Sequence, residues 1–559
     1  MDGAAGCTIR LGGTCLRRNT WLVAGVWLCF LARGCFYSTL LPVWEGYDEP
    51  FHFAFVQYLI AHGSLPVGTD PVSREVQASL HVLPLSWEQR LHAMAPPIYT
   101  QDSYWQLPEV DRRRLQEQVR AIPPTWGFER GTAPAMYEAQ QAPLYYWIMA
   151  VPLRLAWHWP LPARVLLIRL LSVLLASLCI PIAYLAARQF FASEAIGVGL
   201  IALITCMPEL MIDISRAGND CLAIPLYTLL TLLLLAAVEP GGSRWWIAAG
   251  AILGLGLLTK AYFLVAMPAC VLLAVYAAWR APAERKRVLF RGGLGIALAL
   301  LVSFGWYWRN RMLNGAWSGE QTEAAAAHSN LLQLITTIRH VNWVGGVTSV
   351  LVSHVWFGGW SFLKLPKTVY ILFALGMAVA AYGLAKFLIL DRFHSRQQIV
   401  VVVLYAMFWL GLLYHVFLGF VAMGVSASCG WYLYAVVVPE LLLVTCGLFA
   451  IVPKRWRNAV LPALTVAFAA IDLYGVHTLL APYYTGLIAH LPGSDVVIPA
   501  RLQQLAAAGP QLILTRLAVN KPALLGPGTI AVLFMAYYLA TAVAVGVAFV
   551  SASKSESNT

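Results

Sequence analysis

The most chemically informative segment of the chain is Tyr47-Asp48-Glu49-Pro50-Phe51-His52. It places two adjacent carboxylates and an imidazole just beyond the first hydrophobic segment, residues 21–41. Charged groups at the mouth of a membrane helix are costly to keep there and usually mark function. Because His52 follows Asp48 by four residues, both side chains would share one face of a helix. The segment therefore indicates acid/base chemistry at a membrane surface.

A divalent-metal site at Asp48, Glu49 and His52 is an alternative use of the same residues. Three local residues without a defined coordination pattern are weak evidence for it, so a divalent metal stays possible but unassigned. The ten cysteines form no C-x-x-C pair and show no metal-ligand spacing.

The composition excludes an ordinary soluble globular protein. Of the 559 residues, 60% are hydrophobic and 11% are charged, and the mean hydropathy is +0.68. Apolar runs of roughly 20 residues, long enough to cross a bilayer, recur along the chain. We expect an all-α polytopic membrane protein with about twelve spanning helices, near 21–41, 164–187, 195–212, 221–238, 245–259, 262–279, 289–308, 368–390, 398–420, 431–451, 458–477 and 529–551.

The net charge is +12, and the distribution of the basic residues fits the positive-inside rule better than it fits nucleic-acid binding. Basic residues collect in alternate loops, which predicts cytoplasmic N- and C-termini. This assignment requires that 142–157 does not span. That segment is short and carries Pro143, Pro152 and Arg154, so we expect an interfacial or re-entrant helix on the outer side.

The chain is expected to form one integral membrane domain with three long outer stretches, 42–163, 309–367 and 478–528. The first is the most polar and should pack as a small cap. Within it, 51–61 is predicted to be a helix that Gly63 ends.

The predicted topology places acids and cations together at outer helix ends. Each cation also has a structural interpretation: Arg164 and Arg169 are expected to snorkel, Lys260 to cap a helix dipole, and Arg309 and Arg311 to anchor an aromatic belt. Taken together, a carboxylate beside cations suits an enzyme that activates a hydroxyl and stabilises a phosphate leaving group.

Further motifs follow the acidic segment in a characteristic order: Glu138-Ala-Gln-Gln-Ala-Pro-Leu-Tyr-Tyr-Trp147, Arg216-Ala-Gly-Asn-Asp220, Leu257-Leu-Thr-Lys260 and Trp306-Tyr-Trp-Arg-Asn310. This order resembles the GT-C superfamily of polyprenyl-phosphate-sugar-dependent glycosyltransferases, which includes protein O-mannosyltransferases and aminoarabinose transferases acting on lipid A. The Asp-Glu-Pro-x-His form, Phe357–Trp360 and Gly430-Trp-Tyr-Leu-Tyr434 resemble a bacterial membrane family of unknown function thought to belong to the same superfamily.

The resemblance implies a donor sugar on a polyprenyl phosphate and a lipid, glycan or protein acceptor. It implies an inverting transfer at the periplasmic face of a bacterial inner membrane. The catalytic candidates are Asp48, Glu49, His52 and Asp220. The substrate-binding candidates are Glu138, Gln140, Tyr145, Arg216, Asn219, Lys260, Arg309, Arg311 and Tyr432.

Two departures from the superfamily pattern leave donor and acceptor identity open. The usual Pro-Pro before Leu-Tyr-Tyr is Ala142-Pro143 here, preceded by Gln140-Gln141 where an acid is common. The late Gly-Arg-Tyr is Gly430-Trp431-Tyr432. Each departure near these motifs removes a charge.

Two other functions compete with the transferase. A transporter or lipid flippase would usually place ionisable residues and broken helices near the bilayer midplane and often shows inverted repeats, whereas this chain gathers charge at one face and shows no repeat. A polysaccharide ligase or polymerase also has large outer loops, so composition does not separate it from a transferase. The Asp-Glu-Pro-x-His motif favours the transferase.

Overall fold

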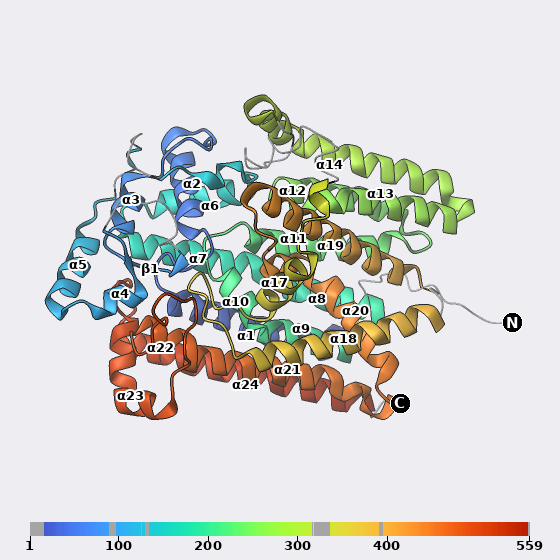
Figure 1. Ribbon diagram of the computed structural model, residues 1–559. Helices are drawn as coiled ribbons and strands as arrows, with labels where there is room; N and C mark the ends of the chain where they lie inside the picture. The colour runs from blue at the N-terminus through green and yellow to red at the C-terminus, as the bar shows by residue number, and fades with distance from the viewer. Residues whose placement is uncertain are drawn as a thin grey trace.

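The computed structural model describes residues 16–88, 97–124, 126–128, 134–315, 317, 336–390 and 395–556. These residues are almost entirely helical (Figure 1). Across the described ranges the one sheet is a parallel pair of two-residue strands, β1 (Pro84–Leu85) and β2 (Tyr99–Thr100). The structure thus confirms an all-α polytopic fold.

Ten helices in the described part are long and apolar enough to cross a bilayer. They contain α1 (Leu16–Leu40), α7 (Leu161–Ser177) continued by α8 (Cys179–Phe191), α11 (Asp220–Ala237), α13 (Tyr262–Arg280), α14 (Arg285–Asn314), α18 (Lys367–Leu390), α19 (Arg396–Met423), α20 (Val437–Ile451), α21 (Arg457–Gly475) and α24 (Pro527–Glu556).

The expected span over 195–212 is broken into two helices. The first, α9 (Glu194–Cys206), meets α10 (Pro208–Ile214) at an angle of 66°. Pro208 lacks the N–H that would continue the ladder, and its ring disfavours a helical conformation at Met207. Counting this pair as one span gives eleven. The expected span over 245–259 is α12 (Trp245–Leu257), whose 13 residues fall short of the roughly 20 that a bilayer needs.

Short helices gather at one end of the bundle, and the end of the last helix, α24, lies at the other (Figure 1). The first group is α2 (Glu49–His62), α3 (Arg74–Leu80), α4 (Gln101–Gln106), α5 (Glu109–Ala121), α6 (Leu144–Leu155), α22 (Ala481–Tyr484) and α23 (Leu502–Leu517). The predicted helix over 51–61 is confirmed within α2, which Gly63 ends in the left-handed conformation. The segment 142–157 forms α6, a separate 12-residue helix.

The stretch 309–367, predicted to lie on the outer side, contributes α17 (Trp343–Val355) and the turn Phe357–Trp360 that follows it. Part of this stretch, 316 and 318–335, lies outside the described residues.

A buried ion pair fastens three of the spanning helices to one another. Arg33 on α1 donates from Nη2 to Asp472 Oδ2 on α21 at 2.7 Å, and both side chains are fully buried. The hydroxyls of Tyr37 and of Tyr537 on α24 also donate to this carboxylate. An ion pair in an apolar interior persists only when further hydrogen bonds satisfy the remaining polar atoms, as they do for Asp472.

Removing one partner of this pair should be strongly destabilising. Arg33→Met leaves a buried, uncompensated carboxylate, so we expect the free energy of unfolding to fall by about 3–5 kcal/mol. Arg188→Met is the matched control, because Arg188 is 40% exposed and lies 3.7 Å from its partner Glu194; its cost should stay below about 1 kcal/mol. Denaturant unfolding in mixed micelles measures both, and equal losses would contradict the role of the buried pair.

Candidate active site

Asp48 sits in a tight turn between α1 and α2. Trp44 and Asp48 both adopt positive φ, 69° and 55°. Gly46 lies between them, where a Cβ atom would come within 2.5 Å of Arg216 Cβ. Pro50 stands in the first turn of α2, where its missing N–H costs nothing. Left-handed backbone at non-glycine residues is typical of functional sites.

The carboxylate of Asp48 does not cap its own helix. Its Oδ1 atom instead accepts a hydrogen bond from the Tyr137 hydroxyl. Tyr137 opens the short 3-10 helix Tyr137–Gln140, so the first outer stretch folds back onto the turn. Asp48 is partly exposed, whereas Glu49 beside it is fully buried.

Glu49 is held by a bidentate ion pair. Arg169 on α7 donates from Nε to Oε1 at 2.7 Å and from Nη2 to Oε2 at 2.5 Å. The backbone N–H of Ala217 also donates to Oε1, at 3.1 Å. The remaining Arg169 donors bind the carbonyls of Leu41 and Pro42 at 2.8 and 2.7 Å. The structure therefore places Glu49, a catalytic candidate, in a saturated clamp that positions its neighbour Asp48.

The expectation that Arg164 and Arg169 snorkel is wrong. Both side chains are almost completely buried, and Arg164 pairs with Glu75 as Arg169 pairs with Glu49. A snorkelling side chain reaches water with its charged head, whereas these two reach carboxylates of the first outer stretch.

Arg216, Asp220 and Lys260 form one buried cluster. Asp220 Oδ2 accepts from Arg216 Nη2 and from Lys260 Nζ, both at 2.5 Å. Arg216 also binds Asp213 Oδ1 at 2.8 Å and the Tyr47 carbonyl at 3.0 Å. The short loop between α10 and α11 makes this possible, because it carries Arg216 and leads directly into Asp220 at the start of α11.

Lys260 is the cation of this cluster that keeps hydrogen-bonding capacity. An ammonium group has three donors, and Asp220 takes one of them. Its nitrogen lies 4.8 Å from the Tyr262 ring centroid and 5.3 Å from that of Tyr432. Tyr432 thus lies at the cluster, as expected for a substrate-binding candidate.

Asp48 lies within the electric field of this cluster. Burial raises the pKa of Asp48, while the hydrogen bond from Tyr137 and the positive charges of Arg216 and Lys260 oppose the rise. Burial raises the pKa of such a carboxyl group, and nearby cations bring the pKa part of the way back toward its usual value. A group of this kind suits a general base near neutral pH.

Glu138 and His52 complete the group around Asp48. Burial, and then the negative charge of Asp48, raise the pKa of Glu138 to about 8. Its Oε2 atom lies 4.0 Å from His52 Nε2. Burial and the charges of Arg216 and Lys260 lower the pKa of His52 well below its usual range, and its Nδ1 atom lies 2.7 Å from the Tyr146 hydroxyl. At pH 7, Glu138 is thus mainly protonated and His52 is neutral.

The other predicted polar residues support the loop that carries Arg216. The Tyr145 hydroxyl accepts from the Gly218 N–H at 3.0 Å. Asn219 Nδ2 donates to Gln141 Oε1 and to the Thr259 carbonyl, each at 3.0 Å. Gln140 is half-buried beside Gln141.

The structure does not bring Arg309 and Arg311 to this cluster. Arg309 donates to the carbonyls of Leu65 and Pro66, beyond the far end of α2 from Asp48. The 14 residues of α2 put about 21 Å between its ends. Arg311 is exposed and binds the Gly315 carbonyl at the end of α14. Spacing along the chain could not show that Arg309 meets the segment after α2 and not the cluster.

Within the described residues, no group of three His, Cys, Asp or Glu side chains is arranged to hold a metal ion. Of the three metal-ligand candidates, Glu49 is bound to Arg169 and His52 faces Tyr146. We therefore derive no step through a metal.

Glu138 should make stability depend on pH. The folded protein keeps the Glu138 proton up to about pH 8, against 4.5 for an unperturbed glutamate. Between these values the folded state binds more protons, so the free energy of unfolding should fall as pH rises, on the order of 1 kcal/mol per pH unit. Glu138→Gln cannot titrate and should flatten this slope.

Denaturant unfolding between about pH 5 and pH 8 measures the effect, because this range lies between the usual pKa of 4.5 and the raised pKa of about 8. Glu109→Gln is the matched control, because Glu109 is exposed on α5. A slope unchanged by Glu138→Gln would contradict the raised pKa.

Residues 140–308 match the family model of dolichyl-phosphate-mannose-protein mannosyltransferase. No curated protein matches the chain. Among solved structures, ArnT from Cupriavidus metallidurans bound to undecaprenyl phosphate is similar, with 14% identity, a TM-score of 0.43, and coverage of 96% of this chain and 78% of that one.

The archaeal oligosaccharyltransferase AglB from Archaeoglobus fulgidus, in complex with an inhibitory peptide and a dolichol-phosphate, is similar with 12% identity and a TM-score of 0.43. The similarity covers 83% of this chain and 56% of that one. The matched segment 140–308 holds Arg216, Asp220 and Lys260. The match to the mannosyltransferase family over this segment confirms the resemblance to the GT-C superfamily that the motifs indicate.

Proposed function

We propose that this protein is a membrane glycosyltransferase that moves a sugar from a polyprenyl-phosphate donor to an acceptor hydroxyl. The observation that carries the proposal is the partly exposed carboxylate of Asp48 in the field of Arg216 and Lys260. This arrangement joins a base to a cation at one site. The family match over 140–308 supports the reaction class.

In the proposed reaction, Asp48 accepts the proton of the acceptor hydroxyl as its oxygen attacks the anomeric carbon. The bond from that carbon to the phosphate oxygen breaks, and the polyprenyl phosphate leaves with the electron pair. Attack from the side opposite the leaving group inverts the anomeric centre. Asp48 then carries the proton, and solvent restores the carboxylate.

We assign Lys260 to the departing phosphate. The Arg216 donors already bind Asp213, Asp220 and the Tyr47 carbonyl. Lys260 meets a single carboxylate among the described residues and keeps donors for an incoming oxygen. A positive charge beside the leaving oxygen stabilises the negative charge that develops there.

We further propose that the site faces the periplasm of a bacterial inner membrane, with both termini in the cytoplasm. The short helices around Asp48 lie at the end of the bundle opposite the end of α24 (Figure 1). The basic groups Arg285-Lys286-Arg287 and Lys454-Arg455 begin helices whose other ends point toward the site. Basic residues of this kind favour the cytoplasmic side.

Asp48→Asn should reduce turnover by about 10²–10⁴-fold, the usual contribution of a general base, and leave folding intact. Consumption of a panel of polyprenyl-phosphate sugars by purified protein in lipid measures this. Asp111→Asn on the exposed helix α5 is the matched control. Full activity of Asp48→Asn would refute the assignment of the base. Consumption of no lipid-linked sugar by the wild type would favour the transporter instead.

Tyr137→Phe should move the acidic limb of the pH profile of kcat/KM to higher pH. The Tyr137 hydroxyl lowers the pKa of Asp48, so its loss raises that pKa, and more alkaline conditions are needed to ionise the base. Tyr474→Phe on α21 is the control and should leave the limb in place. A smaller kcat/KM with an unmoved limb would show that Tyr137 acts on structure alone.

A further inference from the structure

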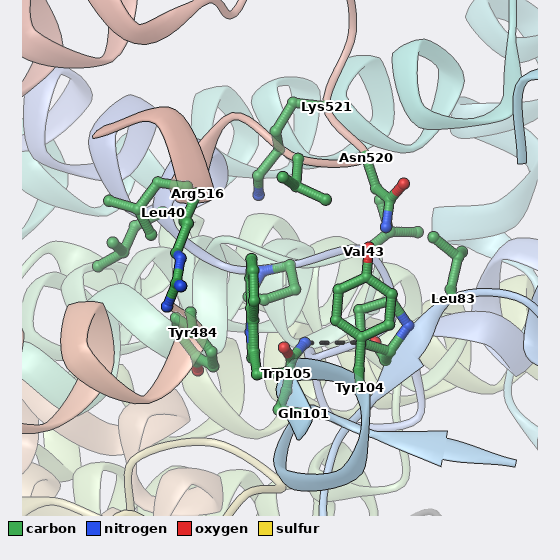
Figure 2. A pocket seen from close by; sticks show the side chains of 14 residues that line it. Leu40, Val43, Leu83, Gln101, Tyr104, Trp105, Tyr484, Arg516, Asn520 and Lys521 are labelled. Carbon is green, nitrogen blue, oxygen red and sulfur yellow. Dashed lines mark hydrogen bonds between the residues drawn. The ribbon is translucent and has the colours of Figure 1, made fainter. Parts of the chain in front are cut away.

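A pocket lined by apolar, aromatic and basic side chains lies apart from the Asp48 cluster (Figure 2). Two helices that contribute to it, α4 and α23, lie at the same end of the bundle as α2 (Figure 1). One wall is the end of α1 and the chain after it, from Leu40 to Val43. The opposite side carries Gln101, Tyr104 and Trp105 of α4. Arg516, Asn520 and Lys521, at and after the end of α23, close it. Figure 2 shows these last three side chains entering from one segment, facing those of α4.

The two cations of the pocket have no carboxylate within ion-pair distance among the described residues. Arg516 Nη1 donates to the Thr485 carbonyl at 2.6 Å, and Lys521 Nζ donates to the Leu41 carbonyl. A third cation, Arg112, likewise binds only carbonyls in the described part of the chain, those of Trp105 and Leu107 at 3.0 Å. Carbonyl oxygens orient these groups but supply no counter-charge to them.

The surroundings of Lys521 disfavour its charged form, and an anion bound beside it would stabilise that form. Burial and the positive charge of Arg169 lower the pKa of Lys521 well below its usual range, and Glu49 and Glu45 only partly oppose this. Glu49 is already paired with Arg169. Burial raises the pKa of Glu45 to about 8, so this carboxyl group is mainly protonated at pH 7. Burial and Arg112 similarly lower the pKa of Arg516.

The Trp105 ring of the pocket lies close to two guanidinium groups. The Arg516 and Arg112 guanidinium carbons lie 4.9 and 5.4 Å from its ring centroid. The Trp105 Nε1–H is a donor that is buried without a hydrogen-bond partner in the described structure. Unsatisfied polar atoms of this kind are costly and often mark a site completed by a bound group.

The position of the pocket indicates where its ligand comes from. Leu40 ends the spanning helix α1, and the segment after Lys521 leads directly into the spanning helix α24. Leu524 in that segment is 69% exposed. Basic pockets between the ends of spanning helices are typical sites for anionic lipid head groups.

We propose that this pocket binds a phosphate group, presented by an anionic lipid headgroup at the surface of the membrane that the bundle spans or by free phosphate. Arginine and lysine are the side chains that recognise phosphate, by directed hydrogen bonds and by compact charge respectively. This site is separate from the one that transfers sugar, and its binding does not depend on the proposed reaction. Lys521 and Arg169 share the Leu41 carbonyl, so the occupant would sit next to the clamp on Glu49.

Binding of short-chain lipids to purified protein in detergent tests the proposal. The probes are dihexanoyl phosphatidic acid, dihexanoylglycerol, which lacks the phosphate, and inorganic phosphate at constant ionic strength. Titration calorimetry should detect binding of the phosphatidic acid and no binding of the diacylglycerol. Lys521→Met and Arg516→Gln should each raise the Kd of the phosphatidic acid by about tenfold or more, since each removes a charged hydrogen bond.

Two further variants separate a lost site from a lost fold. Lys521→Arg keeps the charge and should retain most of the binding. Arg113→Gln on the exposed face of α5 should bind as the wild type does. Competition by inorganic phosphate at similar Kd would identify free phosphate as sufficient, and its failure to compete would identify the lipid as the source. Equal binding of both lipids, or binding unchanged by Lys521→Met and Arg516→Gln, would overturn the proposal.

Discussion

The site depends on the buried ion pair between Glu49 and Arg169. Burying two charges is costly unless geometry and hydrogen bonds are complete. Here both carboxylate oxygens and all three guanidinium nitrogens are used. The pair joins the end of α1, the start of α2, the middle of α7 and the Ala217 N–H. Asp48 directly precedes Glu49 in the chain, so its position follows from that of its neighbour.

Four carboxyl groups near this turn differ because their surroundings differ. Glu49 is saturated by one arginine, and Asp220 is held between Arg216 and Lys260. Burial raises the pKa of Glu138, so that group keeps its proton. Asp48 accepts a hydrogen bond from the Tyr137 hydroxyl and is partly exposed. A reaction that needs one free carboxylate among several can distinguish them in this way, because each environment favours a different protonation state.

Sequence reasoning succeeded where the signal was local. Apolar runs predicted most of the spanning helices, and Gly63 predicted the end of α2. It failed where distant segments meet: nothing near Arg169 in the sequence indicates that its partner is Glu49, 120 residues away. Tyr137 was missed for the same reason, although it directly precedes the candidate Glu138. The break before α10 had a visible signal, Pro208, that the apolar run around it concealed.

The seven-residue helix α10 also has a mechanical consequence. At its start, Glu209 accepts the N–H groups of Phe357 and Gly358 in the second outer stretch, at 2.7 and 3.1 Å. At its other end, Asp213 holds Arg216. So short a helix has little room to bend, and it links the two contacts as a rigid strut. A change in the Phe357–Gly358 turn would therefore shift the cationic cluster with it, so one outer loop can tune the electrostatics of the centre without touching it.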